Sequence, residues 1–208
     1  MSDDTSVSFR TFGTPGAERL VMLVGTPIAV SLDPLPTETA ARDICVLALA
    51  VEGAAIEDPG TFGSETPAEQ TASSLVDLIR ASLETLRPRL DAGTPLTVGL
   101  VAYREAADVA LHAAAVLGET VDRLAMVAVA APETPLDRDD LGVLIERVTA
   151  KTLILNGQHD EPAAYAAATW YKDHLASARV EMVPGDGELG LPAVWARVLA
   201  HVAPHTKR

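Results

Sequence analysis

The chain has 208 residues, of which 48% are hydrophobic and only 4% aromatic, and it carries a formal net charge of −13 at neutral pH. A chain of this length can bury its core as one unit, so we expect a single domain over residues 1–208. The charge argues against a nucleic-acid partner, because affinity for phosphates is carried by Lys and Arg clusters and the sequence shows none.

The cysteine content and the lengths of the apolar runs indicate the cellular compartment. The single cysteine, Cys45, lies in the apolar run Ile44 to Ala50, which indicates a buried thiol and excludes an internal disulfide. No apolar stretch reaches the roughly 18 to 20 residues of a membrane helix. The amino terminus is acidic where a signal peptide is basic. We therefore expect a cytoplasmic protein with no membrane partner.

Apolar runs of strand length are spaced along the chain and are separated by Gly, Pro and polar residues. The first run, Ser6 to Phe12, alternates polar and apolar residues and ends at a Gly-Thr-Pro-Gly turn, which indicates an edge strand. The other predicted strands are Leu20 to Val24, Asp43 to Val51, Leu96 to Ala102, Arg123 to Ala131, the start of Thr152 to Asp160, and Arg179 to Pro184.

Segments with apolar residues at helical spacing lie between these strands. Thr66-Pro67-Ala68-Glu69 is a capping box that predicts a helix running to about Leu90. Because strands that alternate with helices pair in parallel, we predict an α/β fold with a mostly parallel central sheet and helices on both faces. The other predicted helices end at Gly118 or cover Asp139 to Val148, Pro162 to Leu175 and Leu191 to Val202.

The segment Leu96 to Gly118 passes from strand to helix without a connecting loop. Its apolar run stops at Ala102, and an Ala-rich run with helical spacing follows at once. This strand-turn-helix resembles the nucleophile elbow of the α/β-hydrolase family, which reads Gly-x-Ser-x-Gly. With Leu100-Val101 at the end of the strand, Arg104 stands at the nucleophile position. Arginine has no lone pair to offer a carbonyl, so it does not replace an activated hydroxyl.

Two later segments extend the resemblance. Thr152 to Asp160 is similar to the late strand and Gly-x-x-Asp loop that deliver the triad acid in this family, which maps the acid onto Asp160. The family places its catalytic His just after the last strand, commonly as Gly-x-Gly-His, and Glu188 takes that place here. The resemblance thus implies that Arg104, Asp160 and Glu188 converge where Ser, Asp and His would meet.

The resemblance also implies an oxyanion pocket and the size of any lid. The second strand of the family ends in His-Gly before an oxyanion-binding amide, and this chain keeps Gly25, so the amides of Thr26 and Glu105 are the implied donors. Many family members insert a lid domain after the strand predicted at Arg123 to Ala131. Only about twenty residues join the strands there, so we expect little or no lid.

The residue types at the triad positions favour a structural ion-pair cluster over acyl transfer. Arg104 can satisfy Asp160, Glu188 or both through paired N–H bonds. We therefore predict an α/β-hydrolase-like protein that has lost hydrolytic activity and is retained as a small-molecule-binding or regulatory scaffold, the ligand lying in the remnant cleft. No cofactor is expected, and no Cys or His pair has metal-ligand spacing.

Two other functions remain open. One is a weak or atypical carboxylic-ester hydrolase that uses Ser64, Thr26 or His159 with water, or, with the elbow register shifted by one, a carboxylate at Glu105. The other is an interaction module, a homodimer that covers the open top of the sheet. His112, His174 and His201 fall within helices and are interpreted as structural.

Overall fold

The computed structural model describes residues 9–50, 67–86, 96–132, 141–161, 165–185 and 187–207. The predicted capping residue Thr66 and the candidate Ser64 lie outside the described residues. No helix in the described ranges is long and apolar enough to cross a membrane.

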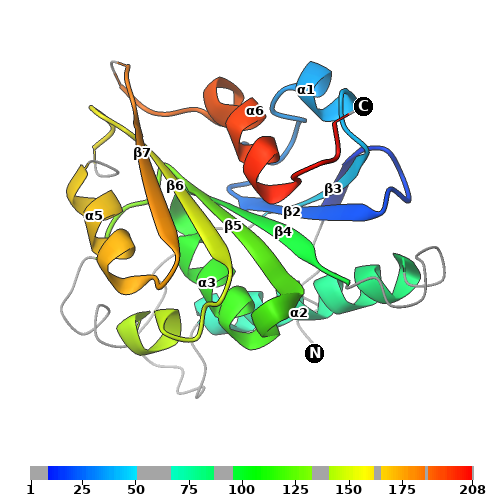
Figure 1. Ribbon diagram of the computed structural model, residues 1–208, viewed down its shortest axis with the longest axis horizontal. Helices are drawn as coiled ribbons and strands as arrows, with labels where there is room; N and C mark the ends of the chain where they lie inside the picture. Colours follow the sequence, from blue (N-terminus) through cyan, green and yellow to red (C-terminus); the bar gives the residue numbers. More distant parts are fainter. Residues whose placement is uncertain are drawn as a thin grey trace, which may run out of the picture.

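A seven-stranded sheet in the order β1-β3-β2-β4-β5-β6-β7 forms the centre of the molecule (Figure 1). β1 pairs with β3 in antiparallel fashion at one edge, and the remaining neighbours pair in parallel. The mostly parallel α/β sheet and the edge position of the first strand are therefore confirmed. The strands are β1 Phe9–Gly13, β2 Arg19–Gly25, β3 Ile44–Ala50, β4 Val98–Tyr103, β5 Val121–Val127, β6 Lys151–Gly157 and β7 Ala178–Val183.

Helices cover both faces of the sheet, as predicted. α2, α3 and α5 lie on one face, and α1 and α6 lie on the other (Figure 1). The Trp195 indole N–H of α6 donates a 2.9 Å hydrogen bond to the Thr39 hydroxyl of α1 and so joins the two helices on that face. The helices are α1 Pro36–Ala40, α2 Pro67–Leu86, α3 Ala107–Leu117, α5 Tyr165–His174 and α6 Leu191–Val202, with short 3₁₀ turns η2 Arg104–Ala106 and η3 Gly118–Thr120 and a helical stretch at 141–145.

The central strands are mostly apolar because each contributes to two cores. Along β2, Leu20, Met22 and Val24 pack into the layer that contains α2, α3 and α5. Val21 and Leu23 pack into the layer that contains α6. Helices on both faces thus explain why these strands appear in the sequence as continuous apolar runs.

The predicted bounds of the strand at Arg123 to Ala131 were wrong, since β5 starts at Val121 and ends at Val127. The chain turns at Ala128, which has φ 54°. The buried Asn156 side chain holds this turn, because it accepts a 3.1 Å hydrogen bond from the Val129 N–H and donates one of 3.0 Å to the Val129 carbonyl. The strand therefore ends because of a partner on β6.

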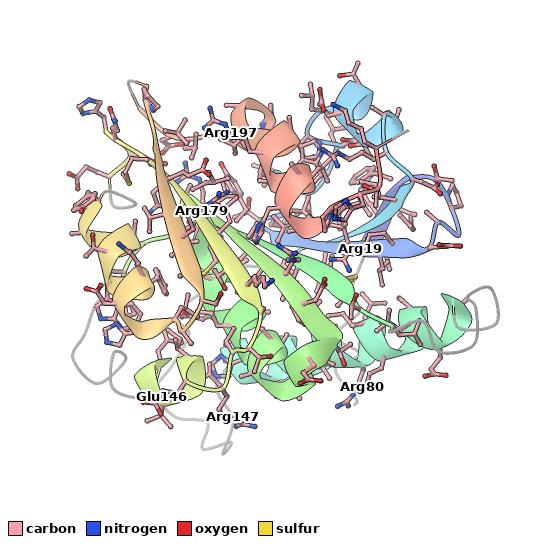
Figure 2. All side chains as sticks on the ribbon, viewed as in Figure 1. Arg19, Arg80, Glu146, Arg147, Arg179 and Arg197 are labelled. Carbon is pink, nitrogen blue, oxygen red and sulfur yellow. The ribbon has the colours of Figure 1, made fainter. Side chains whose placement is uncertain are left out.

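The carboxyl end of α6 is fixed at the amino end of the sheet. Arg19, at the start of β2, donates from Nε to the Val202 carbonyl at 2.9 Å and from Nη1 to Thr97 Oγ1 at 2.9 Å (Figure 2). Its Nη2 lies 2.7 Å from Asp122 Oδ1. Gly99 of β4 lets α6 approach, because a Cβ there would collide with the Val202 backbone. The amino ends of the strands therefore lie beside the last turn of α6.

Candidate functional site

The turn between β4 and α3 is a strained elbow with Arg104 at its apex. Tyr103 is extended, with φ −120° and ψ 123°, and Arg104 follows directly with φ 55°. Within the strand-turn-helix segment Leu96 to Gly118, Arg104 is the one non-glycine residue with positive φ. A non-glycine residue in this region costs about 1 to 3 kcal/mol, and a nucleophile elbow carries its strain at the nucleophile. This geometry favours the register with Arg104 at the apex over the one with Glu105 there.

The Tyr103 hydroxyl anchors the side chain of Arg104. It accepts a 3.0 Å hydrogen bond from Arg104 Nε and donates one of 3.1 Å to the Leu189 carbonyl. The guanidinium carbon also lies 5.3 Å from the centroid of the Tyr103 ring. Sequence reasoning missed this residue. The available signal was its place in the sequence: Tyr103 directly precedes the apex residue Arg104, and its hydroxyl is long enough to reach the Arg104 side chain.

Asp160 is held in a tight turn after β6. Its Oδ2 accepts a 2.8 Å hydrogen bond from the Leu189 N–H. Its Oδ1 is buried and has no hydrogen-bond partner among the described residues. Gly157 permits the turn, since a Cβ at this position would lie 2.8 Å from the Asp160 Cβ. The carboxylate therefore lies beneath the loop that contains Leu189, and among the described residues only one of its oxygens is hydrogen-bonded.

The structure brings Arg104, Asp160 and Glu188 together, and we call them the Arg104 cluster. Arg104 Nη2 lies 3.3 Å from Glu188 Oε2 and 3.8 Å from Asp160 Oδ2. The exposed fractions of the side chains differ widely, at 17% for Arg104, 0% for Asp160 and 80% for Glu188. The pair with Asp160 is thus shielded from water, whereas Glu188 lies at the rim.

The guanidinium of Arg104 stays charged in this setting. Burial lowers its pKa, but the hydrogen bond to the Tyr103 hydroxyl and the negative charges of Asp160 and Glu188 outweigh burial, so the pKa lies above its ordinary value. A permanently protonated guanidinium donates hydrogen bonds and accepts none. At the apex it therefore binds anions and does not attack carbonyls.

The remaining predicted positions lie around this cluster. Thr26 is half-buried in a turn after β2, where its carbonyl accepts a 3.1 Å hydrogen bond from Val30 N–H and its hydroxyl accepts one of 3.4 Å from Ala29 N–H. Glu105 and His159 are exposed. Among the described residues, no hydrogen bond or ion pair joins the His159 ring to the Arg104 cluster. The oxyanion role of the Thr26 and Glu105 amides stays a prediction.

The three helical histidines contact backbone carbonyls away from the cluster. In His112 and His174, Nδ1 lies 2.9 Å and 2.7 Å from the carbonyl four residues earlier. His201 Nε2 lies 2.9 Å from the Lys151 carbonyl and 3.1 Å from that of Leu124. Within the described ranges, no group of three or more His, Cys, Asp or Glu is placed to hold a metal ion.

No protein-family model matches the chain, and no curated protein matches its sequence. Several solved structures do match its fold. MGS-M2, an α/β-hydrolase enzyme from a Medee basin deep-sea metagenome library, superimposes with a TM-score of 0.62 at 15% identity, over 93% of each chain. Est1E from Butyrivibrio proteoclasticus gives 0.63 at 12% identity, over 96% of this chain and 93% of that one.

A monoacylglycerol lipase from Paleococcus ferrophilus also matches, with a TM-score of 0.60 at 12% identity, over 93% of this chain and 96% of the lipase. Together these matches show that the chain has the α/β-hydrolase fold along most of its length. At such low identity the likeness extends to the fold alone, and the chemistry has to be argued from the residues of the site.

Proposed function

We propose that this α/β-hydrolase-fold protein has no hydrolytic activity and serves as a scaffold that binds a small molecule at the carboxyl edge of its sheet. The observation that carries the proposal is the Arg104 cluster at the elbow. Arg104 holds the strained apex with φ 55°, and its guanidinium lies between Asp160 and Glu188. The strain of an elbow is thus retained without a nucleophile.

Acyl transfer needs a nucleophile, a base within hydrogen-bond reach and a group that orients the base. In the Arg104 cluster, the long guanidinium side chain reaches from the apex toward Asp160, a gap that a Ser-His-Asp triad spans with two side chains. A charged Arg104 also repels the imidazolium that a base would become. These residues therefore support binding and not acyl transfer.

The cluster retains groups that suit a polar ligand. Arg104 keeps 17% of its side chain exposed, and Glu188 beside it is 80% exposed. A small molecule that carries an acceptor for Arg104 and a hydroxyl or amine donor for Glu188 would complement these two groups.

Hydrolysis is tested with a panel of short-chain aryl esters and a fluorophosphonate probe for activated serines. We expect no labelling, and no ester turnover that differs between the wild-type protein and the Asp160→Asn variant. Ser64→Ala, Thr26→Ala, His159→Ala and Glu105→Gln are tested beside it, because these four residues are the candidates of an atypical hydrolase. Turnover that disappears in any of the five folded variants would overturn the proposal, whereas turnover common to all of them marks a contaminating enzyme.

A further inference from the structure

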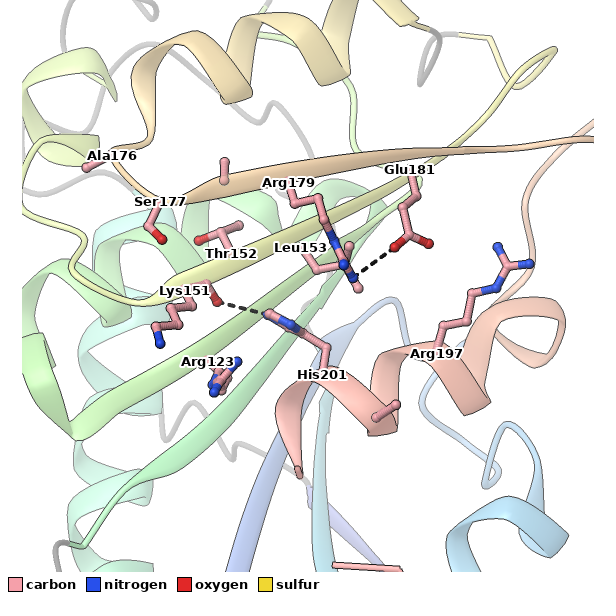
Figure 3. Close-up of a pocket in the computed structure, with 12 residues that line it drawn as sticks. Arg123, Lys151, Thr152, Leu153, Ala176, Ser177, Arg179, Glu181, Arg197 and His201 are labelled. Carbon is pink, nitrogen blue, oxygen red and sulfur yellow. Dashed lines mark hydrogen bonds and ion pairs between the residues drawn. The ribbon is translucent and has the colours of Figure 1, made fainter. Parts of the chain in front are cut away.

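A cavity of about 570 Å³ lies at the opposite end of the sheet from the Arg104 cluster (Figure 3). It opens between α6 and the first residues of β5, β6 and β7, on the face that α5 does not cover. β6 separates the two ends, since Lys151 begins this strand and Asp160 follows it. Seven strand residues span about 20 Å. We call this cavity the basic cavity. The charged and titratable side chains that line it are Arg123, Lys151, Arg179, Glu181, Arg197 and His201.

The parallel register of three strands gathers these side chains. Arg123 of β5 pairs directly with Lys151 of β6, and Leu153 of β6 pairs with Arg179 of β7. Because side chains alternate along a strand, Lys151 shares the face of Leu153, which packs in the α6 layer. α6 then adds Arg197 and His201 from across the opening, four residues apart and thus on one side of the helix.

Positive charge dominates the basic cavity although the whole chain carries −13. Four of the lining side chains are cationic, and one, Glu181, is a carboxylate. Glu181 is already engaged, with Oε1 2.8 Å from Arg179 Nη2. In the described ranges no hydrogen bond or ion pair involves the side chains of Arg123, Lys151 or Arg197. Three cations therefore line the cavity with no counter-charge from the described residues.

The positive charges of the basic cavity also act on His201, which lies in its wall. Its Nε2 contacts the carbonyls of Lys151 and Leu124, which places the proton on that nitrogen. Burial lowers the pKa of His201, and the positive charges of Arg123 and Arg179 lower it further against these hydrogen bonds. An anion in the cavity would relieve this repulsion.

We propose that the basic cavity binds a small phosphorylated molecule. Its cations line two facing walls, the sheet with Arg123, Lys151 and Arg179 and α6 with Arg197. The tetrahedral array of oxygens on a phosphate can meet donors on both walls, which the two oxygens of a planar carboxylate do less well. Its volume lies in the usual range for small-molecule pockets and exceeds what one phosphate fills. Leu153 and Ala200 add apolar surface for the organic part of the ligand. This site is independent of the Arg104 cluster.

Calorimetric titration with pyrophosphate at constant ionic strength tests the proposal. Arg123→Gln and Lys151→Gln are each expected to weaken binding by about tenfold, since each removes a charged donor to the anion. Glu181→Gln should tighten binding, because it removes the carboxylate that the described residues contribute to the cavity. Arg80→Gln is the matched control, since Arg80 lies on α2 across the sheet and is largely exposed (Figure 2).

Citrate at the same ionic strength separates phosphate recognition from general attraction of anions, and it should bind at least about tenfold more weakly than pyrophosphate. Sulfate, whose charge is constant near neutral pH, should raise the pKa of His201 in an NMR titration, and Lys151→Gln should diminish that rise. Lys151 is exposed, so this variant is expected to fold. Binding that changes equally in Lys151→Gln and Arg80→Gln, equal affinity for citrate, or no binding would overturn the proposal.

Discussion

The two acidic partners of Arg104 differ in how deeply they are buried. Glu188 is 80% exposed, and an ion pair in such a position contributes about 0 to 1 kcal/mol. Asp160 is fully buried, and a buried charge that loses its partner costs about 3 to 5 kcal/mol. The hydrogen bond from Leu189 N–H offsets part of the burial of Asp160. Asp160 therefore sets the energetic consequences of changing Arg104.

Arg104→Ala is expected to lower the free energy of unfolding by about 3 kcal/mol, because it leaves the Asp160 carboxylate without a cation. Adding Asp160→Asn should recover a large part of this loss, and the triple variant that also carries Glu188→Gln should be more stable than Arg104→Ala alone. Urea unfolding followed by circular dichroism measures the difference. Recovery by Glu188→Gln as large as that by Asp160→Asn would contradict this assignment.

At the scale of elements, the contact between β4 and α6 fixes the carboxyl end of this helix against the amino end of the sheet. Gly99 lies in the middle of the sheet, and the backbone and side chain of Val202 occupy the space of its missing Cβ. Arg19 ties the same turn of α6 to the starts of neighbouring strands. This packing sets the position of His201, and hence one wall of the basic cavity.

Gly99→Ala is expected to destabilise the protein by about 3 kcal/mol, because a rigid backbone and a β-branched side chain would have to move to admit one methyl group. Gly142→Ala is the matched control. It lies in the helical stretch at 141–145 with nothing within 4 Å of the added Cβ, so its stability should be unchanged or up to about 1 kcal/mol higher. Equal melting temperatures for the two variants would contradict the close packing of α6 on β4.

On the scale of the whole molecule, the sheet carries two polar sites at its opposite ends, and the two differ in their balance of charges. The Arg104 cluster at the carboxyl edge is a cation between acids, and the basic cavity at the amino end is a group of cations with few acids. His201 joins β5, β6 and α6 at the second of these ends. Its protonation is therefore coupled to the stability of the fold.

The contribution of His201 to stability should decrease on acidification. Its pKa in the fold lies below the ordinary value of about 6.5, so the unfolded chain binds its proton first as the pH falls. The contribution of His201 to the free energy of unfolding is fully present above about pH 6.5, and it is lost as the pH falls toward the pKa of His201 in the folded state. Urea unfolding at a series of pH values should show a smaller loss in His201→Gln than in the wild-type protein. An identical pH dependence would contradict this coupling.

Much of the fold was predictable because local pattern and global burial agree. The apolar run Leu20 to Val24 indicates a strand covered on both faces, and β2 is one. The abrupt change at Ala102 indicates a sharp elbow, and the strained Arg104 follows it. The spacing from Gly157 to Asp160 similarly reflects a steric need, because a side chain at the glycine would displace the acid.

The sequence by itself thus determined the order of strands and helices and the residue types along the carboxyl edge, since both depend on neighbours in the chain. Only the tertiary structure decided which charged residues meet. Asp160 is buried and Glu188 exposed because of the loop that covers one of them. Arg123, Lys151 and Arg197 form no cluster in the sequence, yet strand register and helix packing bring them to one cavity. Such contacts depend on long-range pairing, which a linear pattern of residues does not encode.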